Sequence, residues 1–274
     1  TYCPGGPGSA FGNVPQSYTG KEPSTRRSIR NNYDPYMIVF NRLEHYIAMG
    51  KIPDKAELII QGGTFTFFPK AYQEYFVKYA LKAMNDFSKL FFNADGALDI
   101  VKFKEFFELP RLVLGEDERT KKIHSKLLLI KNLDLSNSDS KKKVEDLFFN
   151  DFSNRLFDNV KTFNALRNQE NNKQNEINVP EQNTSLNVIE NQGNDANVLA
   201  IKNVQNKLKI EDNKNLPLKQ MQKENETALI RCVGLTIETK SDFGKLYHGN
   251  LMLELGCTRV EIGIQSIYDD VLEA

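Results

Sequence analysis

RCVGLTIET at residues 231–239 and RVEIGIQS at residues 259–266 are two short, mainly apolar runs of strand length. Between them, residues 242–255 have the length of a helix, which Gly256 is expected to end. A strand, a helix and a second strand in this order are typical of a parallel sheet covered by helices. The sequence therefore predicts an α/β fold for the part of the chain that holds these runs.

A third strand is predicted upstream, at residues 55–61, KAELIIQ. It ends in paired glycines, which let a ligand approach the backbone closely, and ligands of parallel α/β folds bind at the carboxyl ends of the strands. The two other strands carry polar side chains near the same ends, so we expect one edge of the sheet to gather the candidate groups. These are Gly62, Gly63, Thr64, Glu238 and Gln265.

Two amphipathic helices are predicted around the third strand. Asp34 followed by Pro35 is a good start for a helix, and apolar residues then recur at helical spacing up to Gly50. His45 falls on the polar side of this helix. The second helix is predicted from about residue 69 to 86, with its apolar residues on one face.

Composition excludes some classes of protein. Of the 274 residues, 40% are hydrophobic, which is enough for a core, and a formal net charge of zero gives no global field that favours nucleic acid. No run is long and apolar enough to span a bilayer, so no membrane partner is expected. Cys3, Cys232 and Cys257 form neither a disulfide framework nor a CxxC pair, and the last two are expected to be packed core thiols. A reducing, cytoplasmic location is the prediction.

The middle of the chain differs in character from both ends. Residues 168–226 contain fifteen Asn and few aromatic residues, which predicts disorder or loose helices. The preceding residues are rich in Phe and Leu, and they are expected either to form a small helical subdomain or to pack onto the main one. Four acidic residues there miss the spacing of a calcium loop and are expected at the surface: Asp95, Asp99, Glu105 and Glu108. We therefore divide the chain into residues 1–87, a long polar insertion at 88–228, and residues 229–274.

A basic segment lies near the start of the chain. Basic side chains interleaved with aromatic rings suit a single-stranded nucleic acid, because Arg and Lys contact phosphates while rings stack on bases. A solvated basic helix turn would show the same pattern, so both interpretations stay open. The segment holds Lys21, Arg26, Arg27 and Arg30, with Tyr18 and Tyr33 beside them.

The first residues present a cysteine on a turn. Cys3 is followed by PGGPG at residues 4–8, in which Pro fixes φ and Gly opens other backbone paths. Such a turn holds a sulfur on an exposed loop, as metal and cluster sites require. One thiolate makes no site by itself, so an idle cysteine at a frayed end is the alternative.

Several motifs together resemble a known family, the Elongator catalytic subunit in its archaeal form, a tRNA uridine acetyltransferase with a radical S-adenosylmethionine (SAM) domain. The motifs are YCPGGP (2–7), QSYTG (16–20), YDP (33–35), GGTF (62–65), TIET (236–239) and TRVEIGIQS (258–266). They cover residues 1–87 and 229–274. The resemblance implies a partial TIM-like radical SAM barrel that is truncated after its fourth strand and interrupted by the insertion.

The resemblance also implies roles for particular residues. Cys3 corresponds to the last of three thiolates that hold a 4Fe-4S cluster, and the other two would precede Thr1. The glycine strand end, Gly62, Gly63 and Thr64, would approach the methionine part of SAM, and Glu238 and Gln265 would hold its nucleoside. Lys55 matches the lysine that contacts acetyl-CoA and is the candidate catalytic residue.

The implied reaction uses acetyl-CoA and a 5'-deoxyadenosyl radical to place a carboxymethyl group on carbon five of the wobble uridine of tRNA. The basic segment would bind the tRNA, and a homodimer or an Elongator-like assembly is a further expectation. The piece itself is expected to be inactive. Two alternatives remain: a tRNA-binding module that has lost the cluster, and a different radical SAM enzyme that acts on a small molecule.

One departure from the family pattern has a structural consequence. Where the family reads Thr-Arg-Pro-Asp, this chain has TKSD at residues 239–242. The loss of proline softens the turn, so the start of the following helix, expected at Asp242, is free to shift.

Overall fold

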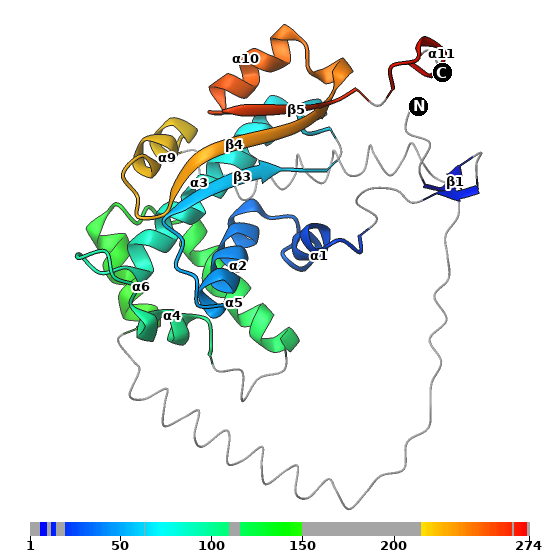
Figure 1. The fold of residues 1–274 in the computed structure, drawn as a ribbon. Helices are drawn as coiled ribbons and strands as arrows, with labels where there is room; N and C mark the ends of the chain where they lie inside the picture. The colour runs from blue at the N-terminus through cyan, green and yellow to red at the C-terminus, as the bar shows by residue number, and fades with distance from the viewer. Residues whose placement is uncertain are drawn as a thin grey trace, which may run out of the picture.

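The structure is a computed structural model that describes residues 6–9, 12–14, 20–62, 64–109, 116–149, 215–264 and 266–272. Its centre is a parallel sheet of three strands in the order β3-β4-β5, namely β3 Lys55–Ile60, β4 Arg231–Lys240 and β5 Arg259–Gly263 (Figure 1). Leu58 pairs with Leu235 in the register of β3 and β4, and Glu238 pairs with Glu261 in that of β4 and β5. The predicted α/β fold is confirmed, whereas the barrel implied by the resemblance stays a prediction.

The other elements follow in chain order. They are β1 Gly6–Ser9, β2 Gly12–Val14, α1 Pro23–Arg30, α2 Pro35–Ala48, η1 Phe65–Phe67, α3 Lys70–Phe91, α4 Ile100–Phe106, α5 Glu116–Lys131, α6 Ser138–Phe148, α9 Leu218–Asn225, η2 Ser241–Phe243, α10 Leu246–Glu254 and α11 Asp269–Leu272. The short strands β1 and β2 pair with each other in an antiparallel hairpin.

Alternation along the strands decides which face of the sheet is buried. Leu235 and Ile237 of β4 are buried and share a cluster with Val77 and Leu81 of α3. Thr236, which lies between them, points to the other face, because successive residues of a strand alternate. Thr236 is itself buried, but Ile59, its partner on β3, is 41% exposed on that face.

The helix α2 begins where the sequence predicts. The carboxylate of Asp34 accepts hydrogen bonds from the backbone N–H groups of Tyr36 (2.9 Å) and Met37 (3.3 Å), with Pro35 at the first position. The helix α3 extends beyond its predicted end at residue 86 to Phe91, because Leu90 and Phe91 continue its apolar face into the core.

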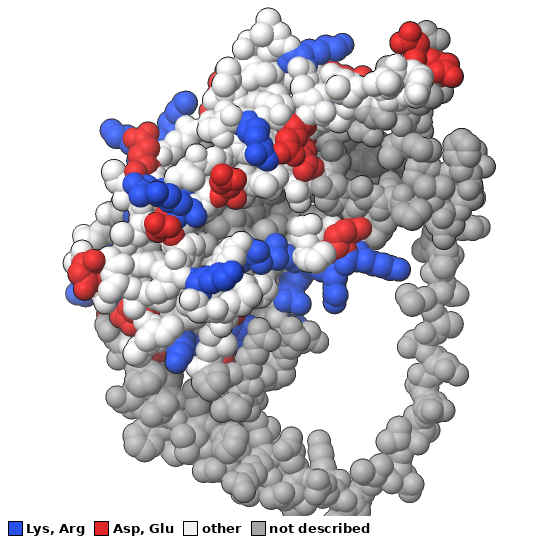
Figure 2. Space-filling model, viewed as in Figure 1, with Lys and Arg blue, Asp and Glu red and all other residues white. Residues whose placement is uncertain are grey.

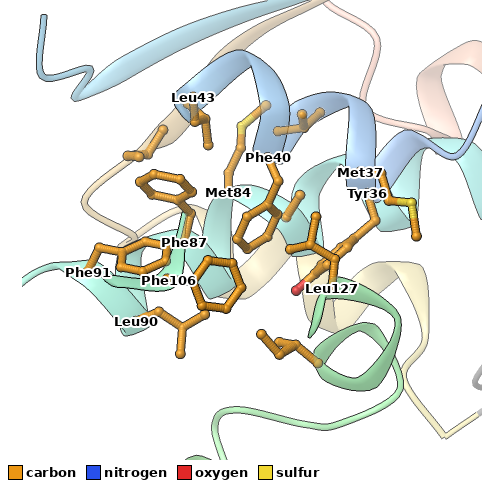
Figure 3. Packing of buried hydrophobic residues seen from close by; sticks show 14 of the residues in the cluster. Tyr36, Met37, Phe40, Leu43, Met84, Phe87, Leu90, Phe91, Phe106 and Leu127 are labelled. Carbon is orange, nitrogen blue, oxygen red and sulfur yellow. The ribbon is translucent and has the colours of Figure 1, made fainter. Parts of the chain in front are cut away.

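An aromatic core joins α3 to the helices on either side of it in the sequence. Figure 3 shows Phe87 and Phe91 of α3 facing Phe40 of α2 and Phe106 of α4. The ring centroids of Phe40 and Phe87 are 5.3 Å apart, as are those of Phe91 and Phe106. Aromatic rings at such separations stabilise a core beyond the area that they bury.

The helices α4, α5 and α6 pack onto this core, which decides between the two expectations for this part of the chain. Buried ion pairs join α5 to α2: Lys131 to Asp34 at 2.6 Å, and Arg119 to Glu44. The proposed domain boundary at residue 88 lies inside α3, and the division of the chain into three parts stays a prediction.

Two expectations about local structure are corrected. Glu108 is not a surface carboxylate: it is half-buried, and Lys126 and Lys122 contact it at 2.6 and 3.0 Å. Asp242 does not begin the predicted α-helix: it lies within the short helix η2, its carboxylate pairs with Lys240 at 2.7 Å, and α10 begins only at Leu246. This is the shift that the softened turn allows.

The end of α10 follows expectation. Gly256 has a φ of +88°, a conformation that favours glycine, and it ends α10 as predicted. The strand β5 is shorter than the predicted run and ends at Gly263. No helix within the described ranges has the length and apolarity needed to cross a membrane.

Candidate functional site

The carboxyl edge of the sheet brings together three of the five predicted edge residues. Gly62 and Thr64 follow β3, and Glu238 lies near the end of β4, whose residues 236 and 237 are paired with the end of β3. Gly62 has a φ of +93°, so only glycine fits this position without strain. Gly63 and Gln265 lie outside the described residues.

The loop after β3 is held against the end of β4 by hydroxyl groups. The Oγ1 atoms of Thr66 and Thr239 are 2.7 Å apart, and the Thr66 hydroxyl donates to the carbonyl of Phe243 at 3.1 Å. Both threonines are buried. The amide of Gln73 in α3 donates to the carbonyl of Phe68 at 2.7 Å, which fixes the far side of the same loop. The loop position beside Gly62 is therefore set by contacts that are far apart in the sequence.

Carboxylates face one another on the exposed side of the sheet. Glu238 stands opposite Glu261 on the neighbouring strand, and like charges in such positions repel. Arg259 forms an ion pair with Glu261, which offsets part of this repulsion. Figure 2 shows acidic and basic side chains next to each other over this face. The half-buried Glu238 carboxylate is suited to accept hydrogen bonds from ligand hydroxyl groups.

Lys55 lies at the other end of the sheet. It is the first residue of β3, it pairs in register with Arg231 at the start of β4, and its side chain is exposed. At ~3.3 Å per residue, the five steps from Lys55 to Ile60 separate it from the carboxyl edge by roughly 17 Å. The structure therefore does not bring Lys55 together with Gly62 and Glu238, and its role with acetyl-CoA stays a prediction.

The two cysteines that the structure describes are packed thiols, as predicted. Cys257 is buried and its Sγ donates to the carbonyl of Arg259 at 3.0 Å, while the half-buried Cys232 donates to that of Gly234 at 3.3 Å. Burial raises the pKa of both thiols above the ordinary value, which disfavours the thiolate form. Cys3, the candidate cluster ligand, lies outside the described residues.

The described residues do not assemble a metal centre. Within them, no group of three or more His, Cys, Asp or Glu side chains could hold a metal ion. Cys3, the one implied ligand of a 4Fe-4S cluster in this chain, is not among the residues to which this statement applies.

The basic segment forms a helix with most of its charges at the surface. Lys21, Arg26 and Arg30 are exposed and Arg27 is half-buried, and three of the four lie in α1. Figure 2 shows Lys and Arg side chains gathered over α1, beside an acidic side chain. The sequence predicted this concentration of basic side chains, and Pro23 starts the helix that carries three of them.

A contact between two side chains of α2 was not predicted from the sequence. The guanidinium carbon of Arg42 lies 4.2 Å from the ring centroid of Tyr46, and an Nη2–H of Arg42 donates to the Tyr46 hydroxyl at 2.9 Å. Arg42 and Tyr46 are four residues apart in a predicted helix, and side chains at i and i+4 lie on the same helix face. This spacing could have predicted their contact.

The fold and this edge define the class of protein. It is an α/β chain whose parallel strands carry glycine and carboxylate groups at one edge of the sheet, and whose helix α1 is rich in arginine. Comparison with known proteins then gives the particular relatives. No protein-family model matches the chain. It is 28% identical over 272 residues to tRNA uridine(34) acetyltransferases of Methanocaldococcus infernus and Methanocaldococcus jannaschii, matches that cover 99% of this chain and 27% of each relative.

Eukaryotic relatives match along the same length. Human Elongator complex protein 3 is 24% identical over 270 residues, which is 98% of this chain and 26% of the relative. The chain is homologous to the archaeal tRNA uridine acetyltransferases and to Elongator complex protein 3 over nearly its whole length, which confirms the resemblance. It spans about a quarter of the length of these curated relatives.

Solved structures also match the chain. The chain overlays archaeal Methanocaldococcus infernus Elp3 with an N-terminal deletion at a TM-score of 0.42 and 23% identity, over 90% of this chain and 28% of that one.

Proposed function

We propose that this chain is part of an enzyme that places a carboxymethyl group on carbon five of the wobble uridine of tRNA, using acetyl-CoA and a 5'-deoxyadenosyl radical derived from S-adenosylmethionine. The observation that carries this proposal is the 28% identity to tRNA uridine(34) acetyltransferases over 99% of the chain. Because the chain spans 27% of the length of those relatives, the activity is proposed for the whole protein. tRNA and acetyl-CoA are its proposed partners and the cytoplasm its proposed location; a homodimer or an Elongator-like assembly stays a prediction.

Under this proposal the carboxyl edge of the sheet holds S-adenosylmethionine. The backbone at Gly62 and Gly63, with Thr64, would lie along the methionine part, since a glycine at this turn leaves no side chain between ligand and backbone. Glu238 would accept hydrogen bonds from the nucleoside, and Gln265 would accept or donate them through its amide group. The pairing of Thr66 with Thr239 supports this role for Gly62, because it fixes the loop without a ligand contributing.

The remaining assignments concern groups at other places in the chain. Cys3 is the proposed cluster ligand; a 4Fe-4S cluster, when bound, supplies the electron that cleaves S-adenosylmethionine. Lys55, at the amino end of β3, is proposed to contact acetyl-CoA. The separation of Lys55 from Glu238 requires these two residues to contact different molecules or distant parts of one assembly.

A test of the proposal uses the native gene product, reconstituted anaerobically with iron and sulfide. It is incubated with S-adenosylmethionine, a reductant, acetyl-CoA and tRNA, and 5'-deoxyadenosine and modified uridine are measured by mass spectrometry. Cys3→Ala is expected to abolish both products, with Cys232→Ala as the control for loss of a thiol. Lys55→Ala is expected to abolish the modified uridine, with the exposed Lys51→Ala as its matched control. Wild-type protein that forms neither product would refute the proposal.

A tRNA-binding module without cluster chemistry is the second candidate function. The observation that favours it is the exposure of Lys21, Arg26 and Arg30, three basic side chains that lie close together in the sequence. Under the same assay such a protein would bind tRNA while forming no 5'-deoxyadenosine.

A further inference from the structure

A cleft lies between three helices that pack on the buried face of the sheet. Val77 of α3, Met221 of α9 and Met252 of α10 belong to one buried cluster with the inward residues of β4. The first turns of α3 and α9 and the last turn of α10 line the cleft, which has a volume of about 290 Å³. A single bound water needs roughly 10–15 Å³, so the cleft has room for a small organic molecule.

Contacts between each pair of these helices hold the walls of the cleft in place. The amide of Asn85 in α3 donates to a backbone carbonyl of α9 at 3.0 Å. The amide of Gln222 in α9 donates to the carbonyl of Leu255 at the end of α10, also at 3.0 Å. An ion pair at 2.7 Å joins α3 to α10, Lys70 to Glu254. The cleft is therefore formed by the chain itself, without a ligand to hold the helices apart.

A buried hydrogen-bond acceptor lies in the wall of the cleft. Gln73 lines the cleft and is 2% exposed, and its amide nitrogen donates to the carbonyl of Phe68 at 2.7 Å. The Oε1 atom of Gln73 is buried and has no hydrogen-bond partner within the part of the chain that the structure describes. The opposite orientation of the amide would set its oxygen against the Phe68 carbonyl, so Oε1 keeps its place. A buried acceptor of this kind costs free energy unless a ligand supplies an N–H or O–H group.

The charges that line the cleft are balanced. Its lining contains two lysines and two glutamates, Lys70, Lys219, Glu74 and Glu254, which give a net charge of zero. The ammonium of Lys70 lies 2.7 Å from the Glu254 carboxylate and 3.7 Å from that of Glu74. No side chain caps the N-terminus of α3 or of α9, and the first N–H groups of a helix attract carboxylates. Groups of both signs in one small cleft are complementary to a ligand that carries both charges.

We propose that this cleft binds a free amino acid with an apolar side chain. Its carboxylate contacts Lys219 and the first N–H groups of α9, and its ammonium group donates to Gln73 Oε1 and to the Glu74 carboxylate. Its side chain packs against the leucines of the lining, Leu218 and Leu251. None of these residues is assigned above to S-adenosylmethionine, acetyl-CoA or tRNA, so the inference goes beyond the proposed function and does not depend on it.

The first experiment measures binding of L-leucine to the native gene product by isothermal titration calorimetry. Leucinamide lacks the carboxylate and N-acetyl-leucine lacks the ammonium group, and each is expected to bind about tenfold more weakly than leucine. Serine keeps both charges without the apolar side chain, and it is also expected to bind more weakly. The two modified leucines stand for the first and the last residue of a peptide, so they separate a free amino acid from a peptide end.

Variants then assign the binding to this cleft. Lys219→Gln is expected to weaken leucine binding about tenfold and to remove the difference between leucine and leucinamide. Lys223→Gln removes an exposed charge of the same helix that does not line the cleft, and this matched control is expected to change neither. Glu74→Gln is expected to weaken leucine binding and to reduce the difference between leucine and N-acetyl-leucine. Far-UV circular dichroism verifies that each variant is folded.

Four results would overturn the inference. They are no binding of leucine, equally tight binding of either modified leucine, unchanged binding in Lys219→Gln, and equal losses in Lys219→Gln and Lys223→Gln. Unchanged binding in Lys219→Gln together with displacement of leucine by S-adenosylmethionine would assign the amino acid to the carboxyl edge of the sheet. The proposed function is decided separately by formation of 5'-deoxyadenosine and modified uridine, so the two can fail independently.

Discussion

Replacement of Lys131 by Met tests whether α5 is anchored to α2 as the structure has it. Lys131 is fully buried, and its ammonium group donates to the carboxylate of Asp34 at 2.6 Å and to the hydroxyl of Tyr75 at 2.7 Å. It also lies 4.4 Å from the ring centroid of Tyr79. Methionine fills a similar volume, so the substitution mainly removes the charge and its hydrogen bonds.

The expected loss of unfolding free energy follows from the buried carboxylate of Asp34 that loses its partner. Asp34 is 1% exposed, and without Lys131 its carboxylate keeps only the two backbone hydrogen bonds at the start of α2. Removing one partner of a buried ion pair typically costs about 3–5 kcal/mol, so Lys131→Met is expected to lower the free energy of unfolding by about 3 kcal/mol or more. The measurement is urea unfolding followed by far-UV circular dichroism.

A second variant and a control make this prediction refutable. In Asp34→Asn combined with Lys131→Met, no charge is buried and asparagine still starts the helix, so stability is expected to return to within about 2 kcal/mol of the unmodified chain. Lys121→Met, on the exposed side of α5, is expected to cost less than about 0.5 kcal/mol. If Lys131→Met costs no more than Lys121→Met, the buried contact between α5 and α2 is refuted.

Three further predictions use the same unfolding measurement. Gly62→Ala forces a side chain into a φ of +93° and is expected to cost about 1 kcal/mol or more; no loss would show that the loop relaxes. Thr239→Val removes the hydroxyl that pairs with Thr66 and is expected to cost about 1 kcal/mol, so an unchanged midpoint would contradict the loop contact. Burial opposes the charge of Glu108, but its hydrogen bond and attraction to Lys126 outweigh this and its pKa lies below the ordinary value. Because a lowered pKa in the folded state contributes stability that is lost as the pH falls, unfolding free energy is expected to decline below about pH 4.5, and less steeply in Lys126→Met.

The local elements could be predicted because their causes lie within a few residues. Asp34 and Pro35 start α2, alternating apolar residues specify β3 and β4, and Gly256 ends α10. These signals depend on capping, period and backbone conformation, which short stretches of sequence contain in full. The start of α10 was not predicted correctly: no side chain caps this helix at its N-terminus, so the sequence holds no capping signal there.

The candidate site was predictable in its composition and only partly in its arrangement. Parallel strands place their carboxyl ends at one edge, so the approach of Glu238 to the end of β3 follows from the order of strands and helices. The position of Lys55 at the opposite end of β3 also follows from the sequence, because Lys55 is the first residue of this strand. The contact between Thr66 and Thr239, 173 positions apart, has no signal in the sequence.

The sequence by itself determined the α/β class, the three strands of the parallel sheet, the bounds of α2 and the kinship with tRNA uridine acetyltransferases, because periodicity, caps and motifs are local properties. Only the tertiary structure decided that α5 docks on α2 through Lys131 and that Thr66 meets Thr239. Both depend on which side chains meet after the chain has folded. Burial then sets the energies of these contacts, because a charge removed from water needs a partner. Residues nearby in the sequence do not identify that partner.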